Sequence, residues 1–169
     1  MTKIFVRQSI MFVSLVFLQV CLFSRIHVFG VATPVVYTYF LIKLPVKLSR
    51  NAVLFLAALI GLSIDIFGYT LGLNMLATII VGFMRYMLLR LFKPRDLIDN
   101  VIPSFGTFGR NMFFRYAGTV TLLHITLLFA IDVNAFLVPS LFILRIAGSF
   151  IISSLIIYGL EMIYSGKGN

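Results

Sequence analysis

The apolar residues of this chain fall into six runs, separated by short segments that carry charge, proline or glycine. A helix needs roughly 20 residues to cross a hydrocarbon core about 30 Å thick, and most of the runs approach that length. The spans predicted by this pattern cover approximately residues 9–23, 33–48, 51–67, 73–92, 111–131 and 136–164. We therefore expect an all-α integral membrane protein: one domain, residues 1–169, forming a compact six-transmembrane-helix bundle.

Three of the segments carry extra signals. The run over 33–48 is short, with Pro34 suited to the first turn of a helix and Pro45 interrupting the far end. Residues 69–72 read as a tight external turn between the third and fourth spans. Residues 93–110 hold charge, proline and glycine, and we interpret them as a cytoplasmic loop.

Composition supports a membrane protein. Hydrophobic residues make up 61% of the chain, charged residues make up 11%, and the mean hydropathy is +1.10. Soluble domains average roughly 45–50% apolar and about 25% charged residues. A water-soluble fold of this size could not bury so much apolar surface.

The net charge of +9 fits membrane orientation better than nucleic-acid binding. In the predicted topology both termini are cytoplasmic, Arg25 alone among the basic residues lies outside, and Arg85 and Arg145 lie within spans. The other basic residues fall on the cytoplasmic side: Lys3, Arg7, Lys43, Lys47, Arg50, Arg90, Lys93, Arg95, Arg110, Arg115 and Lys167. Five of these residues form the expected basic cytoplasmic face: Arg90, Lys93, Arg95, Arg110 and Arg115.

Asp65 is a carboxylate inside otherwise unbroken hydrocarbon, and an ionisable group at membrane depth is costly. It lies roughly 21 Å along its span from the cytoplasmic start, while Arg145 lies roughly 13 Å into a span that enters from outside. These depths are compatible with a buried Asp65–Arg145 pair. The alternative is that Asp65 caps loose backbone N–H groups at the external turn or faces water.

The other polar groups in the spans suggest ordinary roles. We expect Arg85 to extend toward the cytoplasmic headgroups. Glu161 is expected to make a weak, solvated pair with Arg90 or Lys93. The phenylalanines and four tyrosines are mostly expected at the lipid-facing or interfacial surface. These tyrosines are Tyr37, Tyr39, Tyr69 and Tyr86.

The sequence contains no recognisable catalytic constellation. It has no Ser/His/Asp set, paired carboxylates at short spacing, phosphate-binding loop or HExxH motif. Cys21 is the one cysteine, and His27 and His124 share no metal-ligand spacing. We therefore expect a protein that is not an enzyme and that has no metal or cofactor.

The third and fourth runs carry a more specific pattern: Gly61-Leu62-x-x-Asp65, then Gly68, Leu71-Gly72-Leu73, Ala77 and Gly82. This pattern resembles the signature of the rod-shape-determining protein MreD family. Upstream residues also fit it, namely Gln19, Leu22-Phe23, Pro34 and Leu44-Pro45. The resemblance covers Arg7 to Leu91. The family's motif residues carry over only to Gly61, Leu62, Asp65 and Gly72, and Arg145 matches no family motif.

The resemblance implies a bacterial inner-membrane, multi-pass scaffold of the peptidoglycan elongation machinery, which maintains rod cell shape. It implies binding to the bitopic protein MreC. Through MreC it implies links to the filament protein MreB, the glycan polymerase RodA and a class B penicillin-binding transpeptidase.

A rival function follows from architecture. The family is similar to the substrate-binding subunits of energy-coupling-factor vitamin transporters, which are also six-helix bundles. Polar residues for an external pocket would be Asp65, Asn74, Asp132, Asn134 and Arg145. The short external loops offer little lid, and Ala57-x-x-x-Gly61 is a weak match to a small-residue coupling surface. We therefore favour the scaffold and expect no small-molecule substrate.

Overall fold

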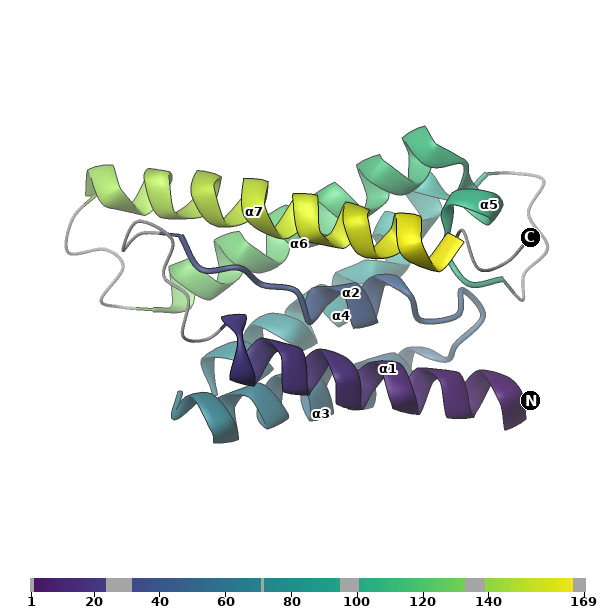
Figure 1. Cartoon of the computed structure of the whole chain (residues 1–169), viewed down its shortest axis with the longest axis horizontal. Coiled ribbons are helices and arrows are strands. Elements are labelled where there is room, and N and C mark those ends of the chain that lie inside the picture. The colour runs from purple at the N-terminus through teal and green to yellow at the C-terminus, as the bar shows by residue number, and fades with distance from the viewer. Residues whose placement is uncertain (1, 24–31, 71, 95–100, 133–138, 166–169) are drawn as a thin grey trace.

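The computed structural model describes residues 2–23, 32–70, 72–94, 101–132 and 139–165 (Figure 1). The helices in this part are α1 (Thr2–Cys21), α2 (Thr38–Ile42), α3 (Arg50–Gly68), α4 (Leu73–Phe92), α5 (Phe105–Phe108), α6 (Arg110–Ile131) and α7 (Pro139–Ser165). Four of the described segments are long and apolar enough to cross a membrane: α3, α4, α6 and the Phe142–Tyr164 part of α7. The chain is therefore a helical membrane protein.

The long helices run along one common axis (Figure 1). α3 packs on α4, α4 on α6, α6 on α7, and α1 on α3. One end of the bundle holds the start of α1, residues 45–49, the end of α4, α5 and the end of α7 (Figure 1). We call it the basic end, because Lys47, Arg50, Arg90 and Arg110 lie there. The opposite end, which holds the α3–α4 turn, is called the hairpin end.

Most predicted boundaries agree with these helices. The predictions for 51–67, 73–92 and 111–131 match α3, α4 and α6 to within one residue at each end. The first helix begins at Thr2, seven residues before the predicted start at 9. The last predicted span, 136–164, corresponds to α7, and its first three residues lie outside the described part. The predicted loop 93–110 contains the short helix α5, which a capping box between Ser104 and Thr107 starts.

The α3–α4 hairpin is built on glycine. A Cβ atom added to Gly61 would lie 2.4 Å from the Met75 Cα and 2.3 Å from the Thr78 Oγ1. At Gly82 it would lie 3.1 Å from the Ala57 Cβ, so small residues bring the two helices together. The predicted turn is also confirmed: Tyr69 ends α3 with a positive φ of 53°, and Gly72 precedes α4 with φ 79°.

Residues 33–48 do not form the predicted transmembrane helix. Residues 33–36 are extended, α2 is five residues long, and turns follow it. This segment, which we call the broken span, runs from the hairpin end to the basic end between α1 and α7 (Figure 1). Its Val36, Leu41 and Ile42 are fully buried.

The broken geometry has a physical reason. The residue before a proline disfavours the helical region, and this applies before both Pro34 and Pro45. A straight helix over 33–48 would also be about 24 Å long, short of the hydrocarbon core of about 30 Å. Extended backbone rises about 3.3 Å per residue, so the same residues reach further. The cost is that extended backbone leaves N–H and C=O groups without helical partners.

Candidate functional site: a broken span held by polar side chains

The Gln19 amide satisfies the first part of the broken span. Its Nε2 donates to the Pro34 carbonyl at 2.9 Å, and its Oε1 accepts from the Val36 N–H at 2.9 Å. Gln19 lies on α1 and is only 3% exposed. One side chain therefore replaces two backbone hydrogen bonds that a helix would have made internally.

Two serines of α7 hold the other side of the same stretch. The Ser149 Oγ accepts from the Thr33 N–H at 3.0 Å, and the Ser153 Oγ accepts from the Val35 N–H at 2.8 Å. Residues four apart lie on one face of a helix, so α7 presents both hydroxyls to the extended strand of backbone. Both serines are fully buried.

Arg85 and Gln8 satisfy carbonyls at the end of α2. The Arg85 Nε donates to the Leu41 carbonyl at 2.9 Å, and its Nη2 donates to the Leu44 carbonyl. The Gln8 Nε2 donates to the Lys43 carbonyl at 2.9 Å. Arg85 is 3% exposed, so the prediction that it extends toward the headgroups is wrong. A cation at the carboxyl end of a helix also interacts favourably with the helix dipole.

A buried ion pair anchors the broken span to α7. The Lys43 Nζ lies 2.9 Å from the Glu161 Oε2 and 3.2 Å from Oε1, with both side chains almost fully buried. The Tyr39 hydroxyl donates to Oε2 at 2.6 Å, and the Phe105 N–H donates to Oε1 at 3.1 Å. The expected solvated pair of Glu161 with Arg90 or Lys93 is therefore wrong. Glu161 instead joins the broken span, α5 and α7.

Asp65 caps α4. Its Oδ2 accepts from the Met75 N–H at 2.8 Å, and its Oδ1 accepts from the Asn74 N–H at 3.1 Å and the Asn74 Nδ2 at 2.9 Å. The Thr70 hydroxyl also donates to Oδ1, at 2.5 Å. A carboxylate at a helix N-terminus satisfies orphan N–H groups and meets the positive end of the helix dipole.

The prediction of an Asp65–Arg145 pair is therefore wrong. Within the described ranges, which include both side chains, the one salt bridge is Lys43–Glu161. Four hydrogen bonds from the hairpin already compensate the Asp65 carboxylate. The capping alternative is confirmed.

Tyr37 links this cap to the broken span and α6. Its hydroxyl donates to the Asn74 Oδ1 at 2.6 Å and lies 2.7 Å from the His124 Nε2. A hydroxyl has one proton, so the His124 Nε2 carries a proton and donates to Tyr37. The expected lipid-facing positions of Tyr37 and Tyr39 are wrong, since both are buried, whereas Tyr69 and Tyr86 are exposed as predicted.

The remaining predicted site residues do not form one site. Leu62 lies on the outer face of α3 and is 42% exposed. Arg145 is half-buried on α7. Of the predicted basic face, Arg90, Lys93, Arg110 and Arg115 lie at the basic end, while Arg95 lies outside the described residues. His124 is buried on α6, while His27 lies outside the described residues.

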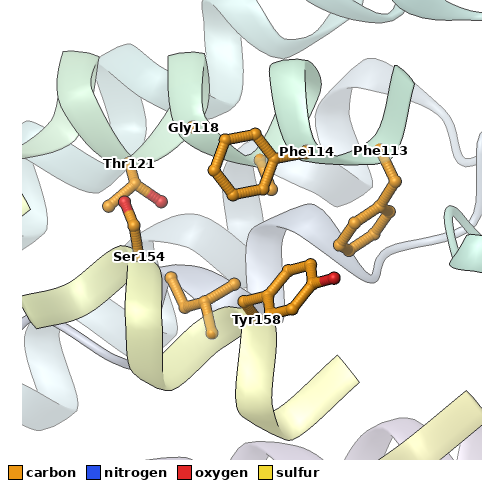
Figure 2. A pocket seen from close by; sticks show the side chains of 8 residues that line it. Phe113, Phe114, Gly118, Thr121, Ser154 and Tyr158 are labelled. Atoms are coloured by element: carbon orange, nitrogen blue, oxygen red, sulfur yellow. The ribbon is translucent and has the colours of Figure 1, made fainter. Parts of the chain in front are cut away.

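A shallow groove lies between α6 and α7. Gly118 and Thr121 of α6 face Ser154 and Tyr158 of α7, and the Phe114 ring lies over the groove in this view (Figure 2). The Thr121 and Ser154 side chains lie opposite one another, and both hydroxyl oxygens are buried without a hydrogen-bond partner among the described residues (Figure 2). A small residue beside two unused hydroxyls is the kind of surface on which transmembrane helices associate.

No family model, curated protein or solved structure matches this chain.

Sequence reasoning missed the supports of the broken span: Gln19 as a hydrogen-bonding residue, the Ser149–Ser153 pair, and the partner of Glu161. Two signals were present. A glutamine inside an apolar helix requires a partner, and two serines four residues apart mark one polar stripe on α7.

Proposed function

We propose that this chain is a membrane scaffold of the MreD family, which binds the bitopic protein MreC within the cell-wall elongation machinery. In this proposal it crosses the bacterial inner membrane six times, with the broken span counted as one crossing. The basic end faces the cytoplasm, in keeping with the positive-inside rule. Its role is to hold partners, and it performs no chemistry.

The observation that carries the proposal is the use of the buried charges. Lys43, Asp65, Arg85 and Glu161 are the charged side chains buried in the described part of the bundle, and each binds backbone or another side chain of the bundle. Their hydrogen bonds stabilise the hairpin and the broken span. This arrangement supports a rigid scaffold more than a ligand pocket.

The residues that carry the resemblance also meet at these junctions. Gly61, Asp65 and Gly72 build the α3–α4 hairpin. Gln19 and Pro34 meet in the broken span. The motif therefore corresponds to the two features that set the shape of the bundle, which supports a family fold rather than a chance match.

The groove between α6 and α7 is the surface that we propose for the MreC helix. Gly118 permits close approach of a backbone, and the Thr121 and Ser154 hydroxyls lie buried beside it without a partner among the described residues. The surrounding face of α7 is exposed and apolar, with Ile151 and Leu155 pointing outward. A single apolar helix could therefore lie along this face in lipid.

The test is affinity purification of the tagged chain from its native membrane in mild detergent, with co-purifying proteins identified by mass spectrometry. Wild type should recover MreC and the cell-wall synthases. Gly118→Leu should lose MreC, because the new side chain fills the groove. The variant itself should fold, since a Cβ added at this position meets only the Phe150 Cζ, at 3.9 Å. The matched control is Gly159→Leu on α7, where a Cβ has open space; it should retain MreC.

The outcomes separate the alternatives. Equal MreC recovery by Gly118→Leu and wild type would refute the groove as the binding surface. Recovery of paired ATPases with a coupling subunit, in place of MreC, would replace the scaffold with the vitamin-transporter function.

A further inference from the structure

A second surface, independent of the scaffold function, lies at the basic end. A cavity of about 750 Å³ opens between the start of α3, the last turns of α4 and residues 46–49. Lys47 and Arg50 lie on one side of it, and Arg90 and Lys93 on the other. Its size falls within the roughly 300–1,000 Å³ of ligand sites.

Arg85 also lines this cavity. Its bonds to the Leu41 and Leu44 carbonyls hold the buried guanidinium in place, whereas Lys47, Arg50 and Arg90 are exposed. No acidic side chain of the described residues lines the cavity. Asp96 and Asp99, which follow Lys93 in the sequence, lie outside the described part. Several cations therefore converge on one concave site, where a single anion can contact more than one of them.

The exposed face of α4 beside the cavity is apolar. The Arg50 guanidinium stacks over the Phe83 ring at 3.9 Å, and Phe83 itself is 55% exposed. Tyr86 lines the cavity and is also exposed, and Met87 beside it faces outward. An occupant with acyl chains could place its headgroup among the cations while its chains follow this outer face of α4.

We propose that this cavity binds the headgroup of an anionic phospholipid that carries two phosphate groups. A headgroup with one phosphate would contact fewer of the exposed cations Lys47, Arg50 and Arg90. A soluble phosphate would make no use of the exposed Phe83 and Met87. Basic pockets between transmembrane helices at the cytoplasmic side are suited to such headgroups.

The experiment uses the purified full-length chain in neutral detergent, titrated with cardiolipin, phosphatidylglycerol or phosphatidylcholine and followed by native mass spectrometry. Cardiolipin should bind most tightly. Lys47→Gln with Arg90→Gln should weaken it roughly thirtyfold, at about 1 kcal/mol per basic residue near a membrane surface. Arg110→Gln with Arg115→Gln is the matched control, since these exposed residues remove the same charge from the same end outside the cavity. The control should bind cardiolipin as wild type does.

Other results would overturn the proposal. Equal weakening by the two double variants would indicate diffuse surface charge and no site. Equal affinity for cardiolipin and phosphatidylglycerol would refute the two-phosphate headgroup. Displacement of cardiolipin by equimolar inorganic diphosphate would assign the cavity to a soluble anion.

Discussion

The α3–α4 hairpin and the broken span solve the same problem in different ways. In the hairpin, helices satisfy their own backbone, and glycines at 61 and 82 let them pack closely. In the broken span, side chains of α1, α4 and α7 supply the missing hydrogen bonds from Gln19, Arg85, Ser149 and Ser153. The hairpin depends on residues close in sequence and on small side chains, whereas the broken span depends on residues up to 122 positions away.

The largest effect is expected from the buried ion pair. Glu161→Leu leaves the Lys43 ammonium buried without its counter-ion and should lower the free energy of unfolding by about 3–5 kcal/mol. The measurement is SDS-induced unfolding of the purified protein in mixed micelles. Adding Lys43→Met should restore most of the loss, because two apolar side chains can replace a buried pair. A double variant no more stable than Glu161→Leu would show that Lys43 is not the main partner.

Gly61→Ala tests the hairpin. The added methyl would overlap the Met75 backbone, which cannot move without shifting α4, so we expect a loss of about 3 kcal/mol, the upper part of the range for overpacking. Gly159→Ala is the control, because nothing lies near its Cβ position. The same unfolding measurement applies, and a loss at Gly61 no larger than at Gly159 would contradict the close packing.

Gln19→Leu tests the broken span without changing charge. It leaves the Pro34 carbonyl and the Val36 N–H without their partner, at about 1 kcal/mol or more each, so a loss of about 2 kcal/mol is expected. Hydrogen–deuterium exchange at Val36 should rise with it. Unchanged exchange at Val36 in Gln19→Leu would contradict this role of Gln19.

These two regions also separate what could be predicted from sequence. The boundaries of α3, α4 and α6 follow from apolar runs and from turn residues such as Gly72, because a membrane helix satisfies its own backbone. The broken span reads as one more apolar run, since Val35, Val36, Leu41 and Ile42 suit a buried segment with a short helix as well as a lipid-facing helix. Pro34 and Pro45 are the local sequence signal that this run is not one continuous helix.

Partners of the buried charges were harder to predict, because depth along a span does not determine which face a side chain occupies. Arg145 and Asp65 have compatible depths, yet Asp65 binds backbone nine and ten residues ahead of it. The sequence predicts both Glu161 and Lys43 at the cytoplasmic surface, because each lies near the end of a predicted span. Only the packing of the broken span against α7 brings them together.

The smallest effect is expected at the Asp65 cap. Asp65→Asn keeps the Oδ1 acceptor but places an amide where Oδ2 receives the Met75 N–H, and it removes the charge at the start of α4. We expect a loss of about 1 kcal/mol, as for other helix caps. Because Asp65 does not pair with Arg145, Asp65→Asn and Arg145→Gln should be additive to within about 0.5 kcal/mol in the same unfolding measurement. A coupling above 1 kcal/mol, by contrast, would restore the ion pair as the reason for a carboxylate at this depth.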